Sequence, residues 1–298
     1  MKKLLVCLLS TLFFIGFAGC SSEQEVLTFR VMTHNLRFSY NAADTDYGNR
    51  RADERMSDEL DFLQSADCDI IFLNEAAKYQ DEILREKAES LGYGFVRESD
   101  FADGIANYNG TKADLYSARF CNYILFRKDK FTLQDTLSFS LSDNPSDPHA
   151  PFSKMSYNAL WNEEGRPRSA VWALLSHKFT ETKILAVCAH AQWITNDNGI
   201  NWNQEGLKVL AEQIEIAQNH YPQAKVIFGG DFNGEDLSAF DPVLYKGVNT
   251  DASFKTFENS AIDHIFYSAS GKHTAACLAG TLALSDHFAL QATIEFTL

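Results

Sequence analysis

The chain has few cysteines and more acidic than basic residues, and each property excludes a class of protein. Six of its 298 residues are cysteines, and no two of them form a CxxC pair, so the sequence argues against a zinc site. Lysine and arginine number 26, whereas aspartate and glutamate number 40. This balance repels polyanions, and the sequence has no basic stripe with interleaved aromatic residues for a long nucleic acid. A phosphate substrate stays compatible with it, because a bound metal ion can dominate the local potential.

Long apolar runs are also scarce, and the one that stands out lies at the N-terminus. Residues 4–18 are mostly apolar and follow Lys2 and Lys3. The run is too short for a comfortable membrane span, and its layout is typical of a secretory signal. Residues 17–20, Phe-Ala-Gly-Cys, resemble a bacterial lipobox, in which Cys20 becomes the lipidated first residue of the mature protein. The alternative is a plain signal peptide that happens to contain a cysteine.

The sequence therefore predicts three parts: a lipoprotein signal peptide over residues 1–19, a lipidated cysteine and polar tether over residues 20–25, and one folded domain over residues 26–298. We expect a monomer that its lipid anchors in the cell envelope, outside the cytoplasm, in the outer membrane or at the cell surface. The four cysteines after residue 20 are compatible with disulfides in that compartment and equally with buried free thiols.

Apolar runs and helical periodicity predict the order of the elements. Strands are expected over residues 27–32, 69–73, 121–126, 168–172, 183–189, 226–228, 261–267 and 274–284, from residue 131, and after residue 287; helices are expected over residues 50–64, 79–91 and 202–219. Hairpins mixed with helices indicate two sheets that pack together, with helices outside them. No repeat or linker interrupts the chain, and its length fits a single domain.

The central motif of the chain is residues 226–234, where an apolar strand runs into two glycines and then into Asp231 and Asn233. Residues i and i+2 at a strand end point to the same side, so the carboxylate and the carboxamide would face one pocket. Such a pair suits a water molecule or a metal-bound oxyanion. The alternative is an Asx turn, in which both side chains only cap the local backbone, and the stretch alone does not decide between them.

Similar polar residues occur at or near the ends of six predicted strands. They are His34-Asn35, Asn74-Glu75, His190, Asp231 with Asn233, Asp263, and Asp286-His287. Each of them alone is most often structural, as a capped turn or a solvated carboxylate. Six such endings in one chain indicate a site at one edge of a sheet.

Taken in order, these residues resemble the endonuclease/exonuclease/phosphatase superfamily of metal-dependent phosphoesterases. The resemblance covers nearly the whole mature chain. The segments that carry it are residues 33–37 (THNLR), 69–75 (DIIFLNE), 122–131 (NYILFRKDKF), 168–172 (RSAVW), 230–233 (GDFN), 262–266 (IDHIF) and 285–287 (SDH). Each segment is short, but the ordered set is highly specific. It implies an α/β (α+β) fold, a four-layer α/β/β/α sandwich in which two mixed sheets are flanked by helices, with the site at one end of the sheets.

The resemblance also implies a role for each site residue. Glu75 would be the main ligand of Mg²⁺ or Mn²⁺, helped by Asn35 and by Asp286, since hard oxygen ligands suit these ions. His287 would be the general base or the cation that stabilises the transition state, held in its tautomer by Asp263.

The remaining roles concern the water and the phosphate. Asp231 would orient or deprotonate the attacking water, and Asn233 would help to fix it. His190 and Arg168 would hold the phosphate oxygens.

Several residues depart from the family pattern. Asn74 stands where the family usually has Gln, which we regard as a minor change because the ligand Glu75 follows it. His264 replaces a usual Tyr, and the neighbours of His190 differ from the family motif. For Trp193 we favour plain packing over stacking on a substrate ring.

The sequence thus predicts a divalent-metal-dependent hydrolase of phosphoester bonds, acting on a phosphodiester in preference to a phosphomonoester. Its partner would be a small, sugar-linked or lipid-linked phosphate ester. Two alternatives stay open: a secreted nuclease of the same family, and a non-catalytic surface lipoprotein that binds a ligand in the old pocket.

Overall fold

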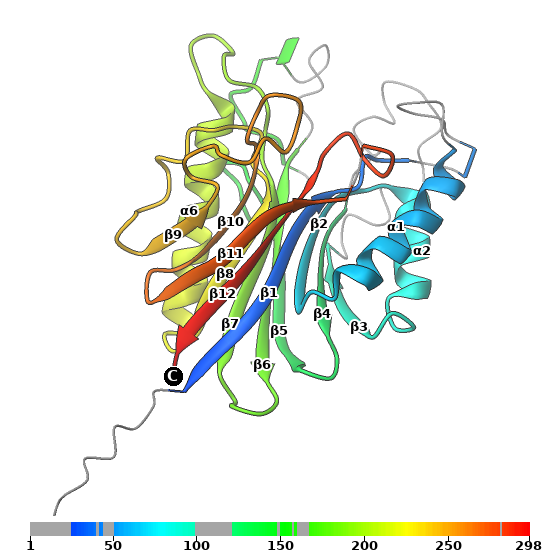
Figure 1. The fold of residues 1–298 in the computed structure, drawn as a ribbon. Coiled ribbons are helices and arrows are strands. Elements are labelled where there is room, and N and C mark those ends of the chain that lie inside the picture. The colour runs from blue at the N-terminus through cyan, green and yellow to red at the C-terminus, as the bar shows by residue number, and fades with distance from the viewer. Residues whose placement is uncertain are drawn as a thin grey trace, which may run out of the picture.

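Two six-stranded β-sheets lie face to face, and helices cover their outer surfaces (Figure 1). The computed structural model describes residues 25–39, 42–43, 51–98, 121–147, 150–156, 158–159, 167–280 and 282–298. The first sheet has the strand order β11-β12-β1-β2-β4-β3, and the second has the order β5-β6-β7-β8-β10-β9. Both sheets are mixed, because one pair in each, β1 with β2 and β7 with β8, is parallel and the other pairs are antiparallel.

The elements follow one another as the apolar runs predict. They are β1 Val26–Asn35, α1 Ala52–Ala66, β2 Ile70–Ala76, α2 Lys78–Lys87, β3 Tyr93–Arg97, β4 Cys121–Arg127, β5 Phe131–Ser140, β6 Ser169–His177, β7 Lys183–His190, α6 Trp202–His220, β8 Lys225–Asp231, β9 Tyr245–Val248, β10 Asp263–Ser268, β11 Gly271–Ala279 and β12 Ala289–Thr297.

Three apolar cores separate four layers. One core fills the space between the two sheets, a second lies between the first sheet and the helices α1 and α2, and a third lies between the second sheet and α6. The buried face of α6 consists of Leu207, Leu210, Ile214 and Ala217, as its periodicity predicts. In Figure 1, α1 and α2 lie on one side of the sheets and α6 on the other. The four-layer α/β/β/α sandwich is therefore confirmed.

Two strands have no counterpart among the predicted elements. Both β3 and β9 are short and lie at the edges of their sheets. In β3 the apolar alternation is interrupted by Gly94, whose missing side chain leaves room for the ring of Phe126 on β4. A glycine weakens the local signal for a strand, so these edges form through pairing with a neighbour rather than through local preference.

The inner face of the sandwich changes character along each strand. On β2 the inward residue Phe72 is followed two positions later by Asn74, and on β7 Cys188 is followed by His190. Since successive side chains of a strand point to opposite faces, residues two apart share a face. Polar residues thus replace apolar ones on the same inner surface toward one end of the two sheets, and that end holds the site.

Some predictions concern residues that the structure does not describe. The signal peptide and Cys20 lie there, as do all of residues 101–118. Within the described residues, no helix is both long and apolar enough to cross a membrane. Cys68, Cys121, Cys188 and Cys277 are free thiols, and the first three are buried.

Candidate active site and family

The predicted site residues gather where both sheets end on the same side. Four come from the first sheet and the segment before β12, and five come from the second sheet and its loops. The first group is Asn35, Glu75, Asp286 and His287, and the second is Arg168, His190, Asp231, Asn233 and Asp263. Strand register explains the convergence, because His190 and Asp263 both pair with Asp231, from β7 and from β10. Three of these residues therefore stand in one row across the second sheet.

Asp231 is buried at the centre of the group. Its Oδ2 accepts a hydrogen bond from Asn35 Nδ2 at 3.0 Å, which joins the two sheets. The same oxygen lies 3.5 Å from His190 Nε2 and 4.0 Å from His287 Nε2. One carboxylate oxygen thus faces a carboxamide and two imidazoles. This arrangement can hold a water molecule, or a cation that balances the charge of a bound anion.

The turn after β8 fixes how this carboxylate points. Gly230 has φ 145°, and a Cβ there would lie 1.9 Å from the carbonyl oxygen of Ala189, so only glycine allows this approach of β8 to β7. The N–H of Asn233 donates to Asp231 Oδ1 at 2.9 Å, and Asn233 Nδ2 donates to the carbonyl of Ala191 at 3.1 Å. Both interpretations of this stretch therefore hold in part, since Oδ1 closes an Asx turn while Oδ2 faces the site.

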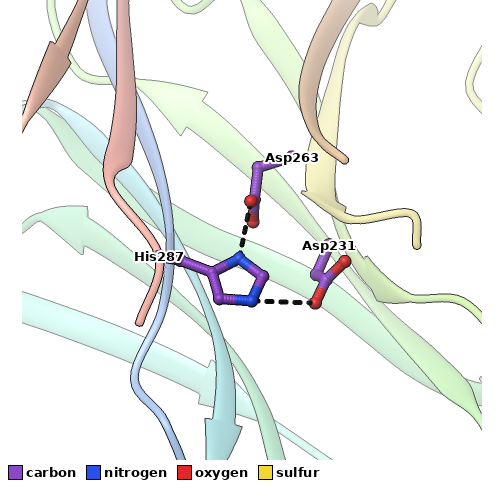
Figure 2. A group of neighbouring side chains, drawn as sticks. All are labelled: Asp231, Asp263 and His287. Atoms are coloured by element: carbon purple, nitrogen blue, oxygen red, sulfur yellow. Dashed lines mark hydrogen bonds and ion pairs between the residues drawn. The ribbon is translucent and has the colours of Figure 1, made fainter. Parts of the chain in front are cut away.

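His287 and Asp263 form a close pair across the two sheets (Figure 2). His287 Nδ1 donates to Asp263 Oδ2 at 2.8 Å, and the ring then directs Nε2 toward Asp231. The ring of Phe257 packs on the imidazole with a centroid distance of 4.7 Å. The predicted partnership of Asp263 with His287 is present in the geometry, and it fixes the tautomer of the imidazole.

Burial and charges in the site shift the pKa values of His287 and Asp231. Burial alone lowers the pKa of His287, but the charge and the hydrogen bond of Asp263 outweigh it. With the charges of Asp231 and Asp286, the pKa of His287 rises to about 10. Burial also raises the pKa of Asp231, and the charges of Asp263 and Glu75 raise it further against the opposing effect of His287. The site thus holds more negative charge than its own groups neutralise.

This excess of negative charge fits a divalent cation. Asp231, Asp263 and His287 each place one ligand atom within 4.8 Å of the others. Asp263 Oδ1 is buried, and no group in the described part of the chain donates a hydrogen bond to it. Oxygen donors from carboxylates and a carboxamide are those that Mg²⁺ and Mn²⁺ prefer. The residues present are therefore compatible with such an ion.

Glu75 reaches the site through an irregularity of β2. The pairing of β2 with β4 shifts between Leu73 and Ala76, and Glu75 inside this bulge has φ 60°. Bulges often redirect a side chain at an active site, and a positive φ in a non-glycine residue is strained. Glu75 Oε2 accepts the N–H of Phe38 at 3.2 Å, and Oε1 lies 3.9 Å from His190 Nε2.

Arg168 and His190 also meet. Arg168 Nη1 lies 2.8 Å from Nε2 and 3.0 Å from Nδ1 of His190, so the guanidinium is in contact with the imidazole. Arg168 comes directly before β6, and its neighbour Ser169 pairs with His190 in the sheet. A guanidinium and an imidazole side by side are suited to hold phosphate oxygens.

Sequence comparison identifies the family to which the chain belongs. The profile of the Endonuclease/Exonuclease/phosphatase family matches residues 32–287, which include every site residue named above. The chain belongs to this family. No curated protein matches it in sequence.

Solved structures of family members share the fold. A family protein from Bacteroides thetaiotaomicron is 21% identical with a TM-score of 0.68, and covers 92% of this chain and 100% of its own. One from Bacteroides vulgatus is 19% identical with a TM-score of 0.70, covering 91% and 99%. A mannosyl-6-phosphatase from Bacteroides thetaiotaomicron is 20% identical with a TM-score of 0.66, covering 89% and 99%.

Family members are hydrolases that act on phosphoester bonds, and they generally depend on divalent metals. The family resemblance assigned Asp286 to the metal, yet here its carboxylate accepts hydrogen bonds from Arg37 Nη1 and Ser285 Oγ. Arg37 also donates its N–H to Asn35 Oδ1 at 2.9 Å. Two predicted ligands therefore contact Arg37, a residue of the first family motif for which we predict no role from the sequence.

Two further residues support the site, although we found no pattern in the sequence that predicts this role. Arg55 on α1 donates to the carbonyls of Leu36 and Arg37, and Gln80 on α2 donates to the same two carbonyls. The segment after Asn35 is therefore held from both helices. Helical periodicity marks Arg55 and Gln80 as inward-facing only once the positions of α1 and α2 are known.

The structure shows the surroundings of His264, Trp193 and Asn74. His264 is buried, with Nε2 3.1 Å from the carbonyl of Gly234, so it supports the turn after Asp231. Trp193, for which we favour plain packing, is 43% exposed and lies three residues after His190. Asn74, which we regarded as a minor change, is fully buried, and its Oδ1 accepts the N–H of Asp231 at 2.9 Å.

Proposed function

We propose that this family member hydrolyses phosphodiester bonds with the help of Mg²⁺ or Mn²⁺. The observation that supports this most is the surroundings of Asp231, where one buried carboxylate oxygen faces Asn35, His190 and His287. A non-catalytic binding protein would have no use for so costly a cluster, because a buried carboxylate without a balancing charge destabilises the fold.

Glu75, Asn35 and Asp286 would hold the cation, with Asp231 and Asp263 close by. When bound, the ion would neutralise charge on the phosphate. Asp263 Oδ1, which lacks a donor among the described residues, is consistent with a cation nearby.

The raised pKa of His287 favours one of its two predicted roles. With a pKa of about 10, the imidazole is protonated at neutral pH, so it would act as a cation that stabilises the transition state or as a general acid. Asp263 would hold it in place through Nδ1.

Asp231 would then be the group that orients and deprotonates the attacking water. Its pKa is raised toward neutrality, and a base is most effective when its pKa is near the working pH. Asn35 and the N–H of Asn233 hold the carboxylate in one orientation, as hydrogen-bonded supports do elsewhere. Arg168 and His190 would bind the phosphate oxygens that do not react.

For the substrate we propose a small or sugar-linked phosphate ester rather than a long nucleic acid, since the chain has a formal net charge of −14. One family neighbour is a mannosyl-6-phosphatase, which makes a sugar phosphate a reasonable candidate. The secreted nuclease is the competing activity within the same family.

The test is hydrolysis of an aryl phosphodiester and of the matching monoester, with Mg²⁺, Mn²⁺ or EDTA. The protein is residues 21–298, compared with His287→Ala and with His220→Ala, whose imidazole is exposed at the end of α6. We expect metal-dependent turnover that His287→Ala loses and His220→Ala keeps, with the diester cleaved faster. Full activity in His287→Ala, or turnover that EDTA does not affect, would contradict the proposal.

We also propose that Cys20 carries lipid and anchors a monomeric domain outside the cytoplasm. Support comes from the sequence of residues 17–20 and from the start of the fold at Val26, directly after the polar tether. Radiolabelled palmitate should label the wild-type chain but not Cys20→Ala in a bacterial host, and label retained in Cys20→Ala would contradict lipidation at this residue.

A further inference from the structure

A chain of buried polar side chains leads away from Asp231 into the space between the sheets. Asn74 on β2 and Asn122 on β4 form its middle, and Glu98, directly after β3, forms its far end. All three side chains are buried, and Glu98 is 0% exposed. Neither the family motifs nor the proposed mechanism gives Asn122 or Glu98 a role.

The hydrogen bonds of this chain all run in the same direction. The N–H of Asp231 donates to Asn74 Oδ1 at 2.9 Å, and Asn74 Nδ2 donates to Asn122 Oδ1 at 2.7 Å. Asn122 Nδ2 then donates to Glu98 Oε1 at 2.6 Å, and the Asn122 N–H donates to Glu98 Oε2 at 3.0 Å. Bonds aligned in this way polarise one another, and a charged acceptor at the end strengthens the series.

A second branch starts from the same carboxylate. Ser169 Oγ donates to Glu98 Oε1 at 2.7 Å, and Asn122 Nδ2 lies 2.9 Å from the Ser169 carbonyl. Ser169 pairs with His190 in the sheet and directly follows Arg168. Glu98 therefore contacts the side chain of Ser169, a neighbour of both Arg168 and His190, and it also ends the chain that holds Asp231.

We infer that Glu98 is a positioning residue, which fixes Asp231 through Asn122 and Asn74 and fixes Arg168 and His190 through Ser169. This inference rests on the proposed function, because it assigns a purpose to the placement of those groups. Only acceptor atoms of Glu98 are used in the described hydrogen bonds, as expected of an ionised carboxylate. A buried charge of this kind destabilises the protein unless several donors surround it, and Glu98 has three from Asn122 and Ser169.

The Asn122 amide donates to the Glu98 carboxylate. The amide and the carboxylate can therefore be exchanged between the two positions. In Glu98→Gln, one carboxylate oxygen becomes an NH₂ group that faces donors, so the chain to Asp231 is interrupted. In Asn122→Asp, a second carboxylate faces Glu98. In the double variant Glu98→Gln/Asn122→Asp, the new amide donates to the new carboxylate, which still accepts from Asn74. The bond between residues 98 and 122 and the bond from Asn74 are then restored with the charge moved by one residue, whereas the bond from residue 122 to the Ser169 carbonyl is lost.

The experiment measures kcat and KM for the phosphodiester in wild type, both single variants and the double variant. We expect each single variant to lose about 10- to 100-fold in kcat, as indirect supports of metal and catalytic groups typically do. KM should change little, and the double variant should recover at least threefold in kcat over the worse single variant. The matched control is Asp69→Asn, another buried carboxylate, which contacts Lys130 and the Arg30 N–H at the opposite end of β2. It should lower thermal stability without changing kcat.

A second readout does not depend on turnover. The amide proton of Asp231 should be protected from exchange in full-length wild-type protein, exposed in both single variants and protected again in the double variant, by ¹⁵N-NMR. If wild type hydrolyses no phosphoester, the proposed function fails while this pattern still tests the positioning chain. Wild-type kcat and unchanged Asp231 exchange in Glu98→Gln, or a double variant no better than the worse single one, would overturn the role of Glu98.

Discussion

The space between the two sheets has an apolar half and a polar half, and they differ in what holds the sheets together. The apolar half is lined by Val31, Phe72, Val96, Ile124, Val171, Cys188, Ile227 and Ile265. The polar half is lined, two or four positions along the same strands, by Asn35, Asn74, Glu98, Asn122, Ser169, His190, Asp231 and Asp263. One surface of each strand thus serves both halves.

The two halves contribute differently: the apolar half to the stability of the fold, and the polar half to the proposed chemistry. Burial of apolar side chains contributes most of the free energy that keeps the sheets packed. In the polar half, buried carboxylates such as Asp231 and Asp263 face one another, and backbone strain occurs at Glu75. Function commonly costs stability in this way. Changes in the polar half should therefore affect turnover, whereas changes in the apolar half should affect folding.

The largest effect is expected in the polar half. Glu75→Ala and His287→Ala remove the main predicted ligand and the cation beside Asp231, and each should lower kcat by about 10²–10⁴-fold or more. Circular dichroism should show that both variants keep the fold. Wild-type turnover in either variant would remove that residue from the mechanism.

Next comes a change confined to the apolar half. Phe29 is fully buried, with ring centroids 5.6 Å from Phe131 and 6.4 Å from Phe296. Phe29→Ala should lower the free energy of unfolding by about 3–5 kcal/mol, because it leaves a cavity. In the folded fraction, kcat should stay within about twofold of wild type. A loss of kcat comparable to that of His287→Ala would show that the two halves are not independent.

A smaller effect concerns the pH dependence of stability and the carboxylate of Asp231. Its pKa is raised in the fold, so the folded state binds this proton more tightly than the unfolded state does. Stability is therefore lost as the pH rises from the unfolded value of about 3.9 through the raised folded value. Denaturation in EDTA should show Asp231→Asn gaining relative to wild type between pH 5 and pH 8. Parallel profiles for the two proteins would contradict the raised pKa.

His287 should act in the same sense but at higher pH. Its folded pKa of about 10 exceeds the unfolded value of about 6.5. Protonation stabilises the fold fully below pH 6.5, and this contribution is lost as the pH rises toward 10. NMR titration of the ring in the metal-free protein should give a midpoint well above 6.5 that falls in Asp263→Asn. An unchanged midpoint in that variant would remove Asp263 as its main cause.

The smallest effect is expected at the rim of the polar half. Trp193 is exposed three residues after His190, and its ring is available to stack on a substrate ring. Trp193→Ala should raise KM a few-fold for aryl or sugar phosphodiesters and leave KM for glycerol-based esters unchanged. Phe179→Ala, at the exposed turn between β6 and β7, is the matched control. An equal change for both substrate classes would contradict stacking.

The elements and most site residues could be predicted from the sequence, because their signals lie in short stretches of the chain. Asp231, Asp263 and His287 follow or begin apolar runs, so strand ends and site residues could be predicted together. Register could not, because the pairing of His190 and Asp263 with Asp231 depends on which strands are neighbours. For the same reason, the edge strands β3 and β9 were not predicted.

The three polar residues that lead from Asp231 into the space between the sheets share one feature. Asn74, Asn122 and Glu98 each stand two positions from an inward-facing apolar residue of their strand, Phe72, Ile124 and Val96. Period-two alternation marks them as inward-facing, and a polar residue at an inward position signals a partner across the sheets. Their partners come from 24 to 157 residues away, so no local pattern identifies them.

Strand β1 joins two opposite poles of the molecule. Val26 begins it beside the C-terminus, where the N–H of Leu298 donates to the carbonyl of Glu25, and Asn35 ends it at the site. Ten residues of strand span about 33 Å. Whatever precedes Val26 therefore attaches at the pole remote from the reaction centre. The active site of a domain tethered there would face away from the membrane. It would therefore meet molecules that diffuse in from the surroundings before it could reach lipid headgroups of the leaflet beneath it.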